Sequence, residues 1–172
     1  KRADFLKYLP ADLVEYMKYI TNLNRERNTQ IIVQANDLNS VLLANNIRPI
    51  FLKGTGNLLA ELYEDTAERM VGDIDFIFSI NDYPKAIAVL RDYGYSDAIK
   101  YKYHCPSNKH YRKLLKENNI AAIEIHKELI SEKHGKEFNY SLVDKDSQLI
   151  NGVSVLSYAN KLNLSIIANQ IN

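Results

Sequence analysis

The sequence is poor in the features that mark several large classes of protein. A single cysteine, Cys105, excludes an internal disulfide and fits a reducing compartment. No apolar run approaches the ~18 residues that a membrane-spanning helix needs. The formal net charge of +1 gives no overall electrostatic signature for nucleic acid or for a membrane surface. We therefore expect a soluble, cytoplasmic protein without a membrane partner.

The composition that is present is ordinary for a globular chain. Hydrophobic residues make up 46% and charged residues 25% of the 172 positions, enough for one folded domain. We expect three segments: a helical N-terminal segment over 1–46 packed on the core, a core over 47–130, and a C-terminal hairpin and helix over 131–172. No stop signal ends the last helix, so we expect the chain to continue into further helices.

Local signals place the elements at both ends of the chain. Apolar residues from Leu13 to Leu42 recur at three- and four-residue spacings, which predicts one long helix or two joined near 22–28. Asn45-Asn46 should end it, because asparagine tolerates a left-handed backbone. Near the other end, Asn151-Gly152 predicts a hairpin turn, and Ser157 is placed to cap the helix that follows.

The middle of the chain begins with a buried strand that ends in a glycine turn. The apolar run Ile47–Leu52 predicts a strand, Lys53-Gly54-Thr55-Gly56 follows at once, and leucines at 58, 59 and 62 predict a helix to about Asp65. A strand, a glycine turn and a helix N-terminus together form a good phosphate cradle, since backbone N–H groups and the helix dipole face the anion. The spacing is not that of a P-loop, and most such turns are only turns.

A second strand carries two carboxylates on one face. In Gly72-Asp73-Ile74-Asp75-Phe76-Ile77-Phe78 side chains alternate, so Asp73 and Asp75 share one face and the apolar residues Ile74, Phe76 and Phe78 share the other. Two neighbouring carboxylates repel each other and resist burial. A divalent metal ion is the simplest partner that would make this arrangement favourable.

A third carboxylate stands on a strand with the same alternation. Lys116–Asn119 reads as the turn of a hairpin whose second arm is Ile120–His126. Glu124 and His126 share one face of that arm, so Glu124 can stand beside Asp73 and Asp75 if the two strands are neighbours. A single glutamate on a strand is normally a surface residue. Glu124 is a candidate site residue because it completes a set of three carboxylates.

Several cationic residues have two readings. Arg69 stands four residues before Asp73. Its structural interpretation is a solvated arginine or a salt-bridge partner of the aspartates, and its functional interpretation is a phosphate contact. The segment Lys100–Lys116 is the most basic part of the chain; it suits a lysine-decorated edge strand, and also a surface that binds nucleic acid. We do not expect zinc at His104, Cys105 and His110, because no fourth ligand follows at a recognisable spacing.

Taken together, these motifs resemble the DNA polymerase beta-like nucleotidyltransferase superfamily, and more closely an uncharacterised bacterial nucleotidyltransferase family within it. The match covers about Leu42 to Leu129. It is carried, in this order, by Lys53-Gly54-Thr55-Gly56, Arg69, Gly72-Asp73-Ile74-Asp75 and Ile123-Glu124-Ile125-His126. One departure from the superfamily pattern is that its usual Gly-Ser turn is Gly54-Thr55 here.

The resemblance implies an α+β fold: a mixed β-sheet with helices packed on it and a helical N-terminal segment. It implies a nucleotidyltransferase that moves a nucleoside monophosphate from an NTP such as ATP to an unknown hydroxyl acceptor. Asp73, Asp75 and Glu124 would hold two Mg²⁺ ions, with Mn²⁺ as a substitute. Phosphates would be bound by the turn Lys53-Gly54-Thr55-Gly56 and by Arg69, and His126 would face the substrate or support the acids. The alternatives are a nucleotide-binding module without turnover and a nucleic-acid-binding domain.

Overall fold

The described part of the chain forms a mixed β-sheet covered by helices on both faces. The computed structural model describes residues 3–98, 110–130 and 134–171. Within them a seven-stranded sheet has the order β3-β4-β5-β2-β1-β7-β6. Its strands are β1 (Ile50–Phe51), β2 (Asp73–Ile77), β3 (Ser96–Asp97), β4 (Leu114–Leu115), β5 (Ala122–His126), β6 (Gln148–Ile150) and β7 (Val153–Val155). Two strand pairs, β2–β5 and β1–β7, are parallel and the rest are antiparallel. The predicted α+β fold with a mixed sheet is confirmed.

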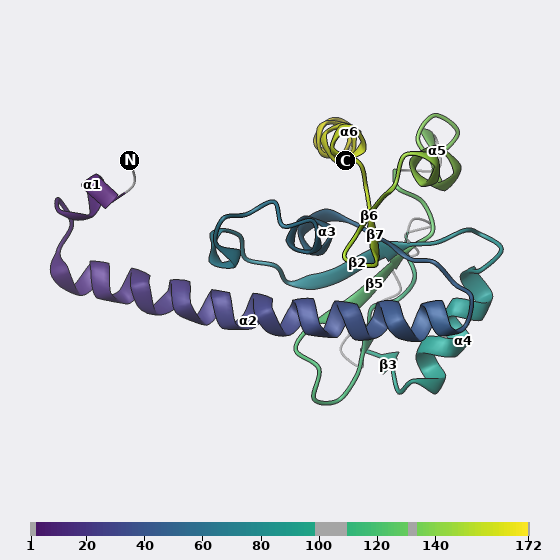
Figure 1. The fold of residues 1–172 in the computed structure, drawn as a ribbon, viewed down its shortest axis with the longest axis horizontal. Helices are drawn as coiled ribbons and strands as arrows, with labels where there is room; N and C mark the ends of the chain where they lie inside the picture. Colours follow the sequence, from purple (N-terminus) through teal and green to yellow (C-terminus); the bar gives the residue numbers. More distant parts are fainter. Residues whose placement is uncertain (1–2, 99–109, 131–133, 172) are drawn as a thin grey trace.

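The helices divide between the two faces of the sheet. They are α1 (Ala3–Leu6), α2 (Ala11–Ala44), α3 (Lys53–Leu59), the short 3₁₀ helix η1 (Thr66–Glu68), α4 (Tyr83–Asp92), α5 (Tyr140–Lys145) and α6 (Tyr158–Ile171). In Figure 1, α2 and α4 lie on one side of the strands, and α5 and α6 lie on the other. None of the described helices is long and apolar enough to cross a membrane.

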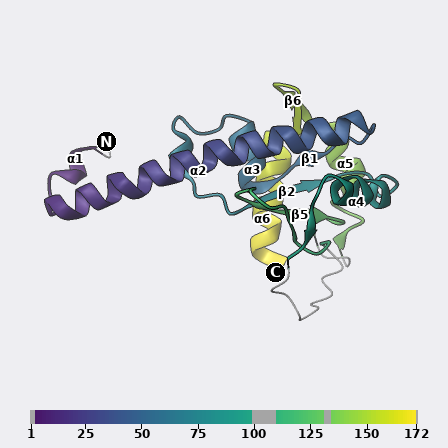
Figure 2. The ribbon, with the colours of Figure 1, turned by 90° about the horizontal axis from the view of Figure 1, so that it is seen from below.

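A single helix of 34 residues, α2, forms most of the N-terminal segment. It is not broken near 22–28, so the one-helix reading of the sequence is correct. It ends as predicted at Asn45, where Asn46 takes a left-handed backbone with φ 57°. The C-terminal half of α2 buries apolar residues against the sheet, whereas its N-terminal half extends well beyond the sheet (Figures 1 and 2).

The alternation along β2 sends its side chains into two different environments. Ile74 and Phe76 pack in the larger core cluster, which includes Leu38 of α2. Ile77 packs in a second cluster with Val143 of α5 and with residues of α6. Asp73 and Asp75, two residues apart and in phase with Ile77, therefore face the α5 and α6 side.

The leucine pattern after the glycine turn predicts too long a helix. Helix α3 ends at Leu59, not near Asp65, because Glu61 adopts a left-handed backbone with φ 54°. Asp65 instead caps η1, where its carboxylate accepts a hydrogen bond from the backbone N–H of Ala67 at 2.9 Å. Leu62 is left largely exposed. The strand before the turn is also shorter than Ile47–Leu52, although both ends of that run are buried.

Both predicted hairpins are confirmed. Strands β4 and β5 pair antiparallel, with Leu114 opposite Ile123. Strands β6 and β7 are joined by Asn151 and Gly152, with φ values of 49° and 80°, as the Asn-Gly signal requires. Ser157 caps α6 as expected, because its hydroxyl accepts a hydrogen bond from the N–H of Asn160 at 3.3 Å. Most of the edge strand expected within Lys100–Lys116 lies outside the described residues.

Candidate active site

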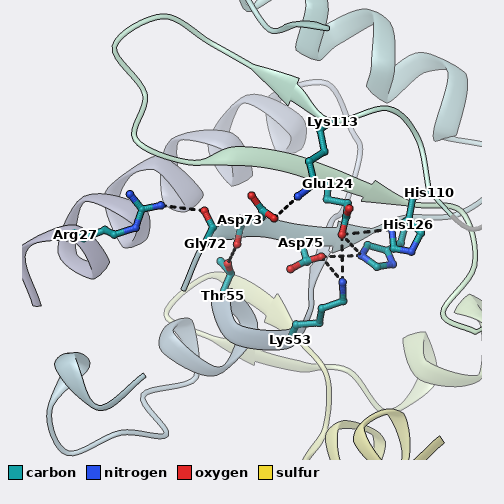
Figure 3. A network of polar contacts seen from close by, with 10 residues as sticks. All are labelled: Arg27, Lys53, Thr55, Gly72, Asp73, Asp75, His110, Lys113, Glu124 and His126. Atoms are coloured by element: carbon teal, nitrogen blue, oxygen red, sulfur yellow. Dashed lines mark hydrogen bonds and ion pairs between the residues drawn. The ribbon is translucent and has the colours of Figure 1, made fainter. Parts of the chain in front are cut away.

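The parallel pairing of β2 with β5 places the three predicted carboxylates on one face and brings Asp75 next to Glu124. The register sets Asp75 opposite Glu124 and Asp73 opposite Ala122. In-register residues of neighbouring strands point to the same face, so all three acids project from one side of this strand pair. Figure 3 shows them along the two strands, with Lys53 approaching from the start of α3.

Lys53 lies between two of the acids. Its Nζ donates to Asp75 Oδ1 at 2.7 Å and to Glu124 Oε2 at 3.2 Å. The backbone of Lys53 is left-handed, with φ 49°, an uncommon conformation for a residue with a side chain. Burial opposes the charged form, but the attraction of Asp75 and Glu124 outweighs it and raises the pKa of Lys53. Lys53 is therefore a cation held against the acids.

His126 contacts the same two acids, Asp75 and Glu124. Its Nε2 lies 2.8 Å from Asp75 Oδ1 and 3.6 Å from Glu124 Oε2. Its side chain is only 2% exposed, so it contacts carboxylates and not solvent. His110 adds a second imidazole, with Nδ1 3.4 Å from Glu124 Oε2. The contacts of His110 and His126 hold the pKa of Glu124 well below its usual range, against the opposing effect of burial.

Asp73, at the start of β2, pairs with a different cation, Lys113. Lys113 Nζ lies 2.5 Å from Asp73 Oδ2. The sequence places Lys113 in a basic segment without showing that it faces an acid. Its position in the β4–β5 hairpin, one residue before β4, is the signal that could have found it, because that hairpin places β4 next to β5.

Polar contacts from α3 and α2 fix the chain on either side of Asp73. Thr55 is fully buried and its hydroxyl donates to the carbonyl of Asp73 at 2.8 Å. From α2, Arg27 donates to the carbonyls of Val71 at 3.2 Å and Gly72 at 3.1 Å. These contacts tie the start of β2 to two helices (Figure 3).

The two glycines of the turn allow close packing. A Cβ on Gly56 would lie 2.5 Å from the carbonyl oxygen of Phe51, which no native contact permits. A Cβ on Gly54 would lie 3.0 Å from a methyl group of Val71 and 3.6 Å from Nε of Arg69. The glycines therefore let α3 lie directly on β1 and on the loop before β2.

Arg69 is exposed beside the first turn of α3. Its backbone carbonyl accepts a hydrogen bond from the buried amide of Asn28 at 2.7 Å. The ion pairs that the structure gives the three acids are made by Lys53, Lys113 and the two histidines.

Most of the basic segment Lys100–Lys116 falls outside the described residues, as do His104 and Cys105. Among its described members, Lys113 faces Asp73, and the Lys116 ammonium lies 3.4 Å from the ring centre of Tyr93.

The carboxylates fit a hard divalent cation. Oxygens of Asp75 and Glu124 already converge on one cationic centre, Lys53 Nζ, at 2.7 and 3.2 Å, and Asp73 projects from the same face. Carboxylate oxygens are the ligands that Mg²⁺ prefers. A metal can share these oxygens if the Lys53 ammonium, on a side chain that is 44% exposed, moves away.

The family of the chain, and the fold that agrees with it, are those of the nucleotidyltransferase class. The chain belongs to a family of uncharacterised nucleotidyltransferases, whose family model matches residues 1–167. Its fold is similar to the crystal structure of TM1012 from Thermotoga maritima, whose own assignment as a nucleotidyltransferase is provisional. That similarity has a TM-score of 0.55 at 11% identity, over 80% of this chain and 83% of the other. No curated protein matches the chain.

Proposed function

We propose that the protein is a magnesium-dependent nucleotidyltransferase that moves a nucleoside monophosphate from an NTP to a hydroxyl acceptor. The observation that supports this most is the placement of Asp73, Asp75 and Glu124 on one face of β2 and β5, beside the first turn of α3. Family membership agrees with it. The acceptor could belong to a protein, an RNA or a small molecule.

The three acids are the residues that would hold the metal. Asp73 and Asp75 would bind two Mg²⁺ ions, and Glu124 would bind the one next to the acceptor hydroxyl; Mn²⁺ could replace Mg²⁺. Bound there, the ions would neutralise phosphate charge and lower the pKa of the attacking hydroxyl.

The surrounding residues position the acids and the phosphates. Thr55 holds the start of β2 through the carbonyl of Asp73, and His126 holds the Asp75 carboxylate in one orientation. The N–H groups that open α3 have no partner within the helix and can donate to a phosphate. Lys53 begins that turn and the Arg69 side chain lies beside Gly54, so both could stabilise the negative charge that develops as pyrophosphate leaves.

A second candidate is a nucleotide-binding module without turnover. It is favoured by the fact that each of the three acids already has a lysine partner, because such pairs stabilise the face without a metal. The two candidates differ in what happens after nucleotide binds: the first forms a covalent product and the second does not.

The test incubates the protein with α-labelled NTPs, Mg²⁺ and a cell extract as the source of acceptor. Transfer predicts label on a product, lost in Asp73→Ala and in Asp75→Ala. Asp92→Ala, which removes an exposed carboxylate at the end of α4, is the matched control and should keep activity. Circular dichroism must show that each variant folds. Nucleotide binding without labelled product would support the second candidate, and unfolding of both site variants would indicate a structural role for the acids.

A further inference from the structure

Two histidines and a glutamate form a compact cluster at one end of the acidic face. Donor atoms of His110, Glu124 and His126 all lie within 4.8 Å of one another. Glu124 Oε2 is 3.4 Å from His110 Nδ1 and 3.6 Å from His126 Nε2. The two rings are stacked at a tilt, with centroids 4.1 Å apart (Figure 3).

The backbone holds all three residues in place. Glu124 and His126 are two residues apart on β5, so they share a face. His110 pairs with His126 through an antiparallel bridge, and the next residue, Tyr111, donates its N–H to the carbonyl of Ile125 at 2.8 Å. The cluster is therefore built on the sheet.

The two separations between the histidine nitrogens and the Glu124 oxygen suit a small four-coordinate ion. Around a tetrahedral Zn²⁺ with bonds near 2.0–2.1 Å, neighbouring ligand atoms are ~3.3 Å apart. The two nitrogen–oxygen separations to Glu124 are close to that value. Within the described residues, the buried Nδ1 atoms of His110 and His126 make no hydrogen bond of good geometry, and Glu124 Oε2, 3.4 Å from His110 Nδ1, is placed to share an ion with it.

The chemistry of these donors differs from that of the rest of the face. Mg²⁺ prefers ligand sets made of oxygen, whereas two imidazoles with one carboxylate suit Zn²⁺ and related transition ions. We infer that His110 Nδ1, Glu124 and His126 Nε2 bind one divalent ion of the zinc type, with a fourth position open. This site shares Glu124 and His126 with the proposed active site but differs from it in the metal, and its binding of an ion requires no nucleotide transfer. The spacing of His104, Cys105 and His110 along the chain does not reveal this cluster, because the partners of His110 come from β5.

Two existing hydrogen bonds have to break before such an ion can bind. His126 Nε2 is 2.8 Å from Asp75 Oδ1, so this hydrogen bond has to break before Nε2 can bind the ion. The Lys53 ammonium is 3.2 Å from Glu124 Oε2 but closer, at 2.7 Å, to Asp75. Its side chain can therefore leave Glu124 and keep its bond to Asp75.

Binding of Co²⁺ to the chelator-treated, metal-free chain tests the site without nucleotide or activity. Co²⁺ takes zinc-type geometries and has visible absorption that is intense only in four-coordinate sites. We expect one Co²⁺ per chain, an intense visible spectrum, and displacement by Zn²⁺ but not by an excess of Mg²⁺. His110→Ala should weaken binding by at least ~10-fold, since losing even a residue that only supports a metal ligand costs that much.

Two further variants keep the test decisive. Asp73→Ala removes a carboxylate of the proposed magnesium site and none of these ligands, so it should retain the Co²⁺ spectrum. His126 is buried and its removal can unfold the chain, so His110→Asn serves as the second ligand variant, with circular dichroism as the folding check. Equal Co²⁺ affinity in wild type and His110→Ala, or a weak spectrum typical of six oxygen ligands, would overturn the inference. Absence of nucleotide transfer would leave it standing.

Discussion

Replacing Gly56 by alanine tests whether the turn glycines serve packing. The added methyl group would lie 2.5 Å from the carbonyl oxygen and 2.9 Å from the carbonyl carbon of Phe51. Both are backbone atoms of a buried strand, so they cannot rotate away, and overpacking costs toward the upper end of the usual range, ~3 kcal/mol. Alanine regains ~1 kcal/mol over glycine inside a helix. We therefore expect the free energy of unfolding to fall by about 2 kcal/mol.

Urea denaturation followed by circular dichroism measures this free energy. The matched control is Gly72→Ala, because a methyl group there meets no atom of the described residues within 4 Å. It should change the free energy of unfolding by no more than ~0.5 kcal/mol. If Gly56→Ala is as stable as the wild type, the close approach of α3 to β1 does not explain the glycine, and access of a phosphate to the backbone becomes the better explanation.

Two other predictions concern the loop that leads to β2. Asn28 is fully buried and its amide donates to two carbonyls of that loop at 2.6 and 2.7 Å, so Asn28→Ala should lower the free energy of unfolding in urea by ~1–3 kcal/mol. Asn36→Ala, which removes an exposed amide bonded within the same helix, should have little effect, and equal losses would contradict the reasoning. Arg25 and the N–H of Ala67 lower the pKa of Asp65 from 3.8 to about 2. The stabilisation by this carboxylate is therefore complete above pH ~4 and is lost as pH falls toward 2. Arg25→Gln should raise the pKa of Asp65 in an NMR titration, and an unchanged value would refute the pairing.

The sequence could predict the acidic face because strand alternation is a local property. Asp73 and Asp75 share a face whatever their strand pairs with, and so do Glu124 and His126. That Asp75 stands opposite Glu124 depends on the parallel pairing of β2 with β5, which no local pattern specifies. The common face was therefore predictable and the register was not.

The contacts of the glycine turn could not be predicted for a similar reason. Lys53 reaches Asp75 and Glu124 from a left-handed backbone conformation. Position 56 has to be glycine because a Cβ there would meet a carbonyl of the neighbouring strand. The leucines after the turn predicted a helix to Asp65, but the backbone of Glu61 ends it earlier. Hydrophobic spacing does not report a single left-handed residue, so this boundary was wrong.

At Lys53, a backbone conformation that lowers stability carries the cation shared by Asp75 and Glu124. A left-handed conformation costs a residue with a side chain ~1–2 kcal/mol, and glycine adopts it freely. A search for stabilising substitutions would therefore favour Lys53→Gly. The same change removes the cation shared by Asp75 and Glu124 and leaves two adjacent carboxylates to repel each other. Selection of this chain for thermal tolerance alone would therefore tend to remove the cation that separates Asp75 from Glu124.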